Sequence, residues 1–266
     1  MLTRSHGLGN DYLVADPAEL PFAVSPQRVR RLCDRHVGVG SDGLLLLEGT
    51  RGLRILNPDG SEAEKSGNGL RIFARWLFDT RRVDARSFTI RVGGAEAAVT
   101  VHADDATVTV DMGRPTFRDD LSAIQVDGRQ LAVSALSIGN PHCVIFRQEL
   151  DVTELRRLGP LVEHHPAFPN RTNMQLAHVA DRRTVDLLIW ERGAGETRAS
   201  GSSSCAVVAA AYRAGLVDTE VTARMPGGEL AVRVDAQGCL WQRGPVEEIA
   251  RITLSPELIE HLQALP

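Results

Sequence analysis

The chain has 266 residues, of which 43% are hydrophobic and 24% are charged, and its formal net charge is −4. This length and composition fit one large globular domain or two domains of roughly 130 residues. The slightly negative charge, without any basic tract, argues against a nucleic-acid partner. No apolar run approaches the ~18 residues of a membrane span, so we expect no membrane partner. The first residues lack the long apolar core of a secretory signal, which predicts a cytoplasmic protein.

The cysteines and the single lysine narrow the possible chemistry. The four cysteines are scattered along the chain, at Cys33, Cys143, Cys205 and Cys239. Because none of them forms a CxxC pair, we expect reduced thiols rather than a metal site or a disulfide framework. Lys65 is the only lysine. A pyridoxal-phosphate enzyme needs a lysine for its Schiff base, and only Lys65 could serve.

Short strands and a few helices are predicted along the first half of the chain. Apolar positions at helical spacing indicate a helix over residues 26–35, and a nearly continuous apolar run indicates another over 67–79. Runs bounded by Gly, Asp and Pro indicate strands, and these are residues 11–16, 44–48, 53–57, 87–92, 97–103 and 106–113. The last three strands are spaced like an antiparallel meander.

The second half repeats this style. Strands are predicted over residues 130–139, 142–146, 184–190, 230–234 and 247–254. A helix is predicted over 151–164, with Asp151 as its N-cap and Glu154 completing a capping box. An apolar helix over 201–214 and a helix over 255–265 follow.

The two apolar helices, 67–79 and 201–214, have no polar face, and such helices are usually buried on all sides. We therefore expect an α+β fold of two pseudo-symmetric halves, each with a curved antiparallel sheet around one central helix. The weak linker signal at residues 113–120 places the domain boundary near the middle of the chain, giving residues 1–115 and 116–266. The C-terminal segment, about 255–266, is expected to pack on the first half.

Each apolar helix opens with the same kind of turn, namely SGNG at residues 66–69 and SGSSS at 200–204. Serine is a good N-cap, and capping alone would explain either copy. The N-terminus of a helix also binds anions, and small residues let a ligand approach the backbone closely. Because both copies open the most apolar helices of the chain, we interpret them as a pair of carboxylate-binding turns.

Four further polar clusters lie beside glycines at predicted strand ends. They contain Asn10, Asn57, the pair Asn140 and His142, and the pair Glu191 and Arg192. One such residue is more often a hydrogen-bonded core residue than a catalyst. Four similar clusters favour a common polar pocket.

The motifs together resemble the diaminopimelate epimerase family. In that family's order, and over most of the chain, the matching stretches are HGLGNDYLVAD, HVGVGSDGLLLLE, ILNPDGSEAEKSGNGLRIFARWL, GNPHCVIF, NRTNMQLAHV and ERGAGETRASGSSSCAVVAAA. The resemblance implies a cofactor-independent epimerase of two mirrored domains with an amino-acid substrate in a cleft between them. Such an enzyme converts LL- to meso-diaminopimelate, a precursor of lysine and peptidoglycan. A homodimer is also implied.

The resemblance also implies roles for individual residues. Ser66 and Ser200 occupy the two catalytic positions at the starts of the central helices. His142 and Glu191 match residues beside the catalytic pair, and the turns at Gly67–Asn68 and Gly201–Ser202 match those that hold the α-carboxylate. The implied substrate-binding residues are Asn10, Asn57, Asn140, Asn173, Glu191 and Arg192.

The family's two catalytic residues are cysteines, whereas this chain has Ser66 and Ser200. A thiol has a pKa near ~8.5, while a serine hydroxyl ionises at far higher pH. A helix dipole contributes only about 1–2 kcal/mol, which is little more than one pKa unit. Each serine therefore needs an adjacent general base, for which His142 and Glu191 are the candidates. Cys205 matches a position without a catalytic role, and we expect it in the core.

Three interpretations stay open at this point. The chain is an epimerase or racemase whose serines are activated by neighbours, with diaminopimelate or another amino acid as substrate. Alternatively, it runs another reaction that starts with removal of an α-proton, such as an elimination or isomerisation. The third interpretation is an amino-acid-binding homologue without catalysis. An engineered pair of Cys→Ser exchanges is disfavoured, because the turn SGSSSC differs from the family's usual CGTGAC at further positions.

Overall fold

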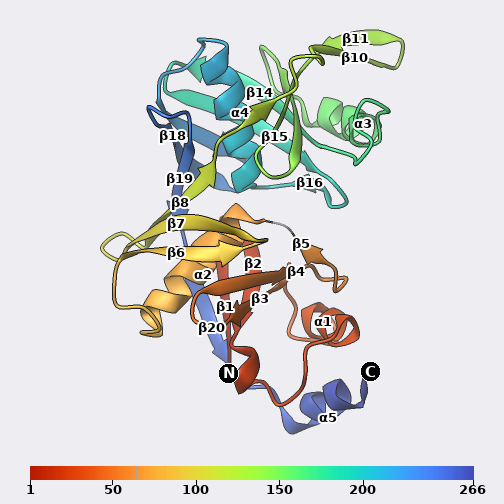
Figure 1. Cartoon of the computed structure of the whole chain (residues 1–266). Coiled ribbons are helices and arrows are strands. Elements are labelled where there is room, and N and C mark those ends of the chain that lie inside the picture. Colours follow the sequence, from red (N-terminus) through yellow and green to blue (C-terminus); the bar gives the residue numbers. More distant parts are fainter. Residues whose placement is uncertain (64) are drawn as a thin grey trace. The chain divides into compact units, whose positions relative to one another are not determined.

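The computed structural model describes residues 1–63 and 65–266. The chain forms two compact units. Unit 1 comprises Met1–Val110 together with Pro245–Pro266, and unit 2 comprises Asp111–Gly244. Figure 1 labels the helices and strands of both units.

Unit 1 is built on a mixed sheet with strand order β20, β1, β2, β3, β4, β6, β7, β8, in which only the pairs β2–β3 and β4–β6 are parallel among the described residues. Its elements are β1 (Leu2–Gly7), β2 (Asn10–Ala15), the 3-10 helix η1 (Pro17–Glu19), α1 (Pro26–Cys33), β3 (Leu44–Glu48), β4 (Gly52–Leu56), β5 (Glu62–Ala63), α2 (Gly67–Asp79), β6 (Ser87–Val92), β7 (Ala95–His102), β8 (Thr107–Gly113), β20 (Glu247–Ile252) and α5 (Pro256–Ala264). The strand β8 runs across the boundary of the unit.

Unit 2 has a sheet with strand order β9, β12, β13, β14, β15, β17, β18, β19, in which β13–β14 and β15–β17 are parallel. Its elements are β9 (Thr116–Phe117), β10 (Ala123–Val126), β11 (Arg129–Ala132), β12 (Ser134–Ser137), β13 (Pro141–Phe146), α3 (Val152–Glu163), β14 (Asn173–Asp181), β15 (Thr184–Glu191), β16 (Gly195–Thr197), α4 (Gly201–Arg213), β17 (Glu220–Met225), β18 (Gly228–Val234) and β19 (Leu240–Pro245). The hairpin β10–β11 stands apart from this sheet.

The two units repeat one topology. Starting from β1 in unit 1 and from β12 in unit 2, the successive strand pairs follow the same order of parallel and antiparallel pairing. In each unit the second and the fourth pair are parallel, and the first and third are antiparallel. A helix joins the second and third strands in each unit, and α2 or α4 joins the fourth strand to the next parallel one. This order confirms the predicted pseudo-symmetric α+β fold. The parallel pairs are an addition to the antiparallel sheets that we expected.

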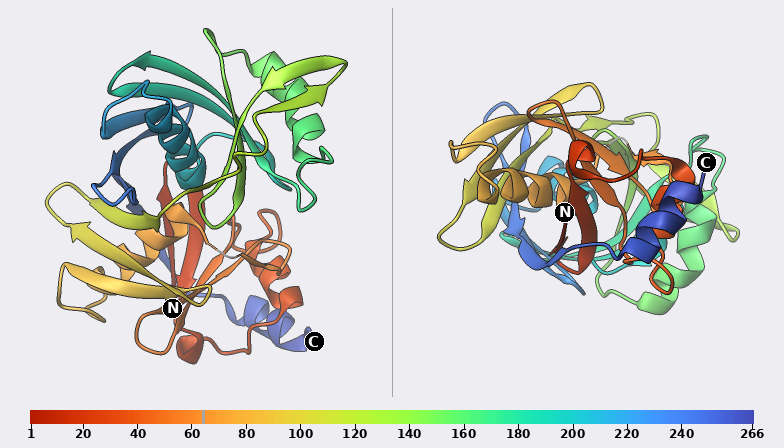
Figure 2. Two further views of the ribbon diagram at one scale, coloured as in Figure 1. Left: turned by 45° about the horizontal axis from the view of Figure 1, so that its top comes forward. Right: turned by 90° about the horizontal axis from the view of Figure 1, so that it is seen from below.

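The central helices α2 and α4 are buried, as their sequences predict. The helix α2 contacts β1, β2, β4 and β7, while α4 contacts β12–β15, β17 and β18. Within α4 the whole run Ser203–Ala211 is buried, and α2 buries Leu70–Ala74, which includes Arg71. Figures 1 and 2 show each helix lying against the strands of its own unit. The start of each central helix is thus fixed by packing along its length.

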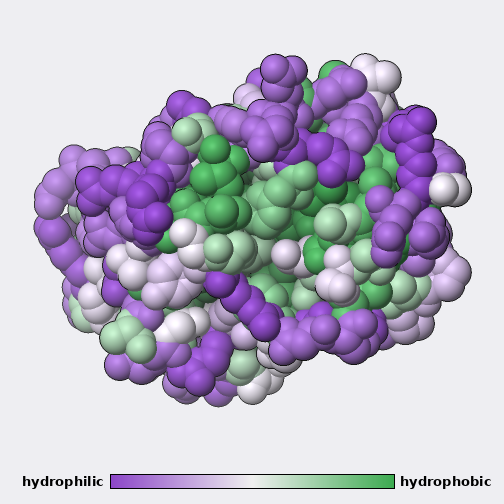
Figure 3. Space-filling view, turned by 90° about the horizontal axis from the view of Figure 1, so that it is seen from above, coloured by the Kyte–Doolittle hydropathy of each residue, from purple (hydrophilic) through white to green (hydrophobic). Residues whose placement is uncertain are grey.

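The remaining helices cover other faces of the sheets. In unit 2, Leu155, Leu158 and Val162 of α3 pack against β13 and β14. In unit 1, α5 lies beside α1 (Figure 2), and Leu262 is fully buried in a cluster with Leu32. A band of apolar surface bordered by hydrophilic residues crosses the face of unit 2 seen in Figure 3.

Most predicted elements are present with shifts of one to three residues at their ends. One detail is wrong: Asp151 caps α3 by accepting from Thr153 N, but the Glu154 carboxylate instead accepts from Arg147, so the capping box is not formed as predicted. Because β20 pairs with β1, more of the C-terminal segment joins unit 1 than residues 255–266. The division at residues 115 and 116 stays a prediction. Among the described residues, no helix is long and apolar enough to cross a membrane.

Candidate active site

Ser200 caps the central helix of unit 2. Its backbone is extended (φ −148°, ψ 124°), and its Oγ accepts from Ser203 N at 3.4 Å. The Ser202 Oγ lies 3.4 Å from the same oxygen. Glycine is required next to the cap, because a Cβ on Gly201 would lie 2.5 Å from Gln242 Oε1. Ser200 is therefore closely packed and buried, with 4% of the residue exposed.

A chain of amides and an imidazole continues from Ser202. Asn140 Nδ2 donates to Ser202 Oγ at 3.4 Å, and Asn140 Oδ1 lies 3.0 Å from His142 Nε2. On its other side, His142 Nδ1 lies 3.1 Å from Gln175 Nε2, which also donates to Ser203 Oγ at 3.0 Å. Together with the Ser203 N–H, these contacts close a ring around the start of α4.

His142 is fully buried in this ring. Burial lowers its pKa to about 3, and the positive charge of Arg192 adds to this shift. The His142 imidazole is therefore neutral near pH 7. The imidazole is connected to Ser200 only indirectly, through Asn140 and Ser202 on one side and through Gln175 and Ser203 on the other. The contacts of the described residues therefore do not support its proposed part as a direct base.

Ser66 caps the central helix of unit 1 in the same way. Its Oγ accepts from Gly69 N at 3.1 Å and lies 3.4 Å from the hydroxyl of Tyr12. A Cβ on Gly69 would lie 3.2 Å from the Cβ of Ser66, so glycine keeps this turn tight. Tyr12 occupies the place in β2 that His142 occupies in β13, two residues after an asparagine in each case. One ionisable group thus follows each asparagine, but only Tyr12 contacts its serine.

The asparagine of each cluster bonds to the second residue of the central helix. Asn68 Nδ2 donates to Asn10 Oδ1 at 3.1 Å, as Asn140 donates to Ser202 in unit 2. Asn10 donates in turn to Asp42, and the Asn68 amide oxygen accepts from the buried Arg71 at 2.7 Å. The start of α2 is thereby tied to β2 by polar contacts.

An ion-pair cluster around the buried Asp11 supports β2. Asp11 contacts Arg4 and Arg35 at 2.7 Å each, and Arg35 also contacts Asp42 at 2.7 Å. Burial acts to raise the pKa of Asp11, but the two guanidinium groups hold it below its ordinary value. The charged form of Asp11 therefore persists at neutral pH and fixes the strand that carries Asn10.

Asn57 lies in a separate turn after β4. Its Nδ2 donates to Ser61 Oγ at 3.0 Å, and its backbone N–H donates to the Ser61 carbonyl. These contacts of Asn57 lie within its own turn, so its part in substrate binding stays a prediction.

Asn173 and Glu163 hold the turn that carries Glu191 and Arg192. Asn173 Oδ1 accepts from Arg192 N at 3.0 Å, while its Nδ2 donates to the Pro141 carbonyl. The Glu163 carboxylate accepts from Gly193 N at 2.9 Å. Asn173 thus ties this turn to the strand of His142, which is a structural contact in addition to its expected part in binding.

Glu163 is a buried residue that the sequence did not identify. It is 4% exposed, and its carboxylate also accepts from Trp190 Nε1 at 2.8 Å and contacts Arg171 at 3.2 Å. Burial acts to raise its pKa, but the hydrogen bonds from Trp190 and Gly193 outweigh that effect and lower it. A carboxylate therefore anchors the turn after β15.

Three of the cysteines, Cys33, Cys143 and Cys205, are buried. Burial raises the pKa of Cys143 to about 12 and also raises that of Cys33, so these thiols stay protonated at neutral pH. The expected core position of Cys205 agrees with its full burial.

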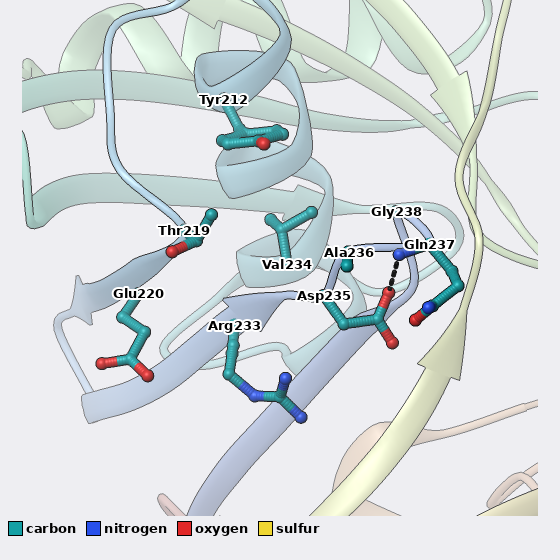
Figure 4. Close-up of a pocket in the computed structure, with 9 residues that line it drawn as sticks. All are labelled: Tyr212, Thr219, Glu220, Arg233, Val234, Asp235, Ala236, Gln237 and Gly238. Atoms are coloured by element: carbon teal, nitrogen blue, oxygen red, sulfur yellow. Dashed lines mark hydrogen bonds between the residues drawn. The ribbon is translucent and has the colours of Figure 1, made fainter.

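A surface pocket of about 580 Å³ lies at the other end of α4 (Figure 4), lined by Tyr212, Thr219, Glu220, Arg233, Val234, Asp235, Ala236, Gln237 and Gly238. Its floor is a turn in which Asp235 accepts from Gln237 N and Trp241 Nε1. None of the predicted site residues lines this pocket. The helix separates it from Ser200 by about 18 Å along the axis.

The fold defines a class of α+β proteins in which two units of one topology each pack a sheet against a central helix. A hydroxyproline epimerase from Agrobacterium vitis, with bound trans-4-hydroxy-L-proline, has the same fold, with a TM-score of 0.72, 14% identity, and 94% of this chain and 90% of that chain covered. Among curated relatives, a protein named diaminopimelate epimerase 2 from Nostoc sp. strain PCC 7120 is 43% identical, covering 96% of this chain and 95% of the relative.

A diaminopimelate epimerase from Stutzerimonas stutzeri is 39% identical, covering 86% of this chain and 89% of the relative. The model of the family described as diaminopimelate epimerase matches residues 2–118 and 134–249. The chain belongs to the diaminopimelate epimerase family, and it is an isomerase of that epimerase and racemase type.

Proposed function

We propose that this protein epimerises an amino acid at its α-carbon without a cofactor, with LL-diaminopimelate as substrate and meso-diaminopimelate as product. The relatives at 36–43% identity that carry this name support the reaction. The observation that carries our assignment of the site is the duplicated cap. In each unit a serine precedes the buried central helix, and its Oγ accepts a hydrogen bond from a backbone N–H of the first turn.

The reaction needs one group to remove the α-proton and another to deliver a proton to the opposite face. We assign these parts to Ser66 and Ser200, acting on the same α-carbon. When Ser66 takes the α-proton, its own hydroxyl proton passes to the phenolate of Tyr12, while Ser200 gives its proton to the substrate. After the product leaves, Ser200 takes a proton from solvent and Tyr12 releases one to it, so that each turnover restores the starting protonation of the site.

Binding of the substrate follows from the same two helix starts. The amides of Gly67–Asn68 and Gly201–Ser202 are the candidate donors to its α-carboxylate, since helix N-termini favour anions. Asn10, Asn57, Asn140, Asn173, Glu191 and Arg192 are the candidate contacts for its amino groups and its distal end. We place Glu191 beside the reacting centre, together with His142 as a neutral neighbour rather than a base.

The protein is further proposed to work as a homodimer in the cytoplasm. The apolar band on unit 2 in Figure 3 supports a subunit contact, because contiguous apolar surface often marks an interaction site. Sedimentation of the purified chain tests the oligomeric state. A monomer at all concentrations would contradict this part of the proposal alone.

Incubation with LL-diaminopimelate in heavy water tests the reaction. Epimerisation must introduce deuterium at the α-carbon and produce the meso isomer, whereas a binding protein leaves the α-proton in place. We expect Ser66→Ala and Ser200→Ala to abolish inversion. The Ser66→Cys, Ser200→Cys double variant should turn over faster than the native chain, because a thiol is far more acidic than a hydroxyl.

Ser255→Ala is the matched control for these variants. Ser255 caps the surface helix α5 by accepting from Leu258 N at 3.2 Å, so its loss costs about 1 kcal/mol of stability as at the other caps. It should leave deuterium incorporation unchanged. If the native chain binds diaminopimelate by calorimetry but exchanges no α-proton at any pH, the catalytic proposal is wrong and a binding protein is indicated.

A further inference from the structure

The ring at the start of α4 contains a glutamine whose orientation decides the direction of every hydrogen bond in it. Gln175 lies on β14 and is fully buried. Its Nε2 group faces both His142 Nδ1, at 3.1 Å, and Ser203 Oγ, at 3.0 Å. Among the described residues its Oε1 has no hydrogen-bond partner.

The alternative orientation of this amide is less stable. Turning the amide by 180° would place Oε1 against His142 and Ser203, and it would leave Nε2 without partners. An amide nitrogen has two protons to satisfy, while the oxygen can be left unpartnered at a lower cost. Gln175 therefore donates to both neighbours.

The direction of the remaining bonds follows from this donation. Because His142 Nδ1 accepts a proton from Gln175, the neutral ring must carry its own proton on Nε2. That N–H then donates to Asn140 Oδ1, which turns the amide protons of Asn140 toward Ser202 Oγ. Ser202 thus accepts from Asn140 with one lone pair of its Oγ. Either hydroxyl of the Ser202–Ser200 pair can donate across their 3.4 Å contact, and we assign the donation to Ser202.

Ser200 stands at the end of this series. With this assignment, its Oγ accepts from the Ser202 hydroxyl and from the Ser203 N–H, both at 3.4 Å. With both accepting positions used inside the ring, the Ser200 proton points out of it. Unit 1 has no matching relay among its described contacts, since Tyr12 contacts Ser66 directly.

We infer that Gln175 is a positioning residue, which fixes the tautomer of His142 and through the ring orients the hydroxyl of Ser200 as a proton donor to the substrate. The tautomer of His142 does not depend on any reaction. The orientation of Ser200 toward a substrate rests on the proposed function, and the two parts are tested separately.

Nitrogen NMR of the full chain labelled with 15N-histidine tests the first part. We expect the neutral Nε2–H form for His142, and loss of its signal in His142→Gln assigns it. His178, which lies on β14 with Gln175, is an internal control for which the opposite tautomer is expected. Its Nδ1 faces the Arg147 carbonyl at 3.2 Å, so its neutral ring must carry the proton on Nδ1.

In Gln175→Leu the His142 ring loses its donor, and a mixture of tautomers should replace the single form, while His178 stays unchanged. A proton on Nδ1 of His142 in the native chain overturns the inference. An unchanged His142 spectrum in Gln175→Leu overturns it as well.

Deuterium incorporation into diaminopimelate tests the second part. We expect Gln175→Leu to lose at least about tenfold in the rate of inversion without a matching change in the affinity for the substrate. Met174→Leu, a substitution at the neighbouring fully buried position, is the control for disturbed packing and should keep the native rate. Equal losses in both variants would refute the positioning part. Should the native chain show no inversion, the proposed function fails, and the NMR result still decides the part played by Gln175.

Discussion

The contacts of the buried Glu163 carboxylate predict how much stability the protein loses when this charge is removed. Glu163→Gln keeps the shape of the side chain but replaces one acceptor oxygen by a donor. Since Gly193 N and Trp190 Nε1 both donate to this group, one of them must lose its acceptor. A bond to a charged group contributes ~1.5–3 kcal/mol, and an unpaired buried donor costs ~1–3 kcal/mol. We expect a loss of about 2–4 kcal/mol, or roughly 5–10 °C in Tm.

The effect of this substitution should depend on pH with a definite sign. The folded state holds the pKa of Glu163 below its ordinary value, so its contribution is present above about pH 4.5 and is lost as pH falls through the folded pKa. The gap in Tm between the native chain and Glu163→Gln should therefore narrow below about pH 4. Thermal unfolding followed by circular dichroism from pH 7 to pH 3 measures it.

Glu196→Gln is the control for a carboxylate in an exposed ion pair. Glu196 contacts Arg156 at 2.6 Å, with side chains 39% and 63% exposed, and such pairs contribute ~0–1 kcal/mol. A gap for Glu163→Gln that is no larger than that of Glu196→Gln, or that stays constant with pH, would refute the reasoning. Because Glu163 holds the turn after Arg192, the variant should also raise the KM for the substrate.

Three further expectations can be checked on single variants. Tyr12→Phe should lower the rate of α-proton exchange about tenfold, because it removes the hydroxyl that contacts Ser66, while Tyr212→Phe should change nothing; deuterium incorporation decides it. Since the folded pKa of His142 lies near 3 and below its unfolded value of 6.5, stability should fall by about 1.4 kcal/mol per unit as pH drops between those values. Urea unfolding of His142→Gln at pH 7 and 5 should show that this slope is lost. Gly159→Ala would place a Cβ 2.3 Å from the Trp190 ring, so we expect it to lower the free energy of unfolding by about 1–3 kcal/mol, measured in urea.

The parts of the fold that depend on local pattern were predictable. The apolar runs after Ser66 and Ser200 identified the central helices, and glycine beside each serine identified the caps. Strand pairing was less accessible, because a local apolar pattern does not say which partner a strand has. The parallel pairs β2–β3 and β4–β6 therefore could not be read from the sequence.

The site was predictable only where its residues share a motif. Asn140 and His142 lie two positions apart and do contact each other. Gln175 follows in the chain by 33 positions and sits in an apolar strand, so nothing local distinguishes it from a core residue. Glu163 at the end of α3 is separated from Gly193 by 30 positions. Tertiary contacts of this kind appear only when the strands are placed together.

The discontinuous make-up of unit 1 has a consequence for biosynthesis. Unit 2 is one continuous stretch of the chain. In unit 1, by contrast, β1 pairs with β20 and α1 packs against Leu262 of α5, and both partners are synthesised last. During translation, the middle of the polypeptide can therefore complete its own tertiary structure while the earlier segment still lacks its last strand. A ribosome-bound chain stalled after residue 244 should accordingly protect unit 2, but not β1, from protease.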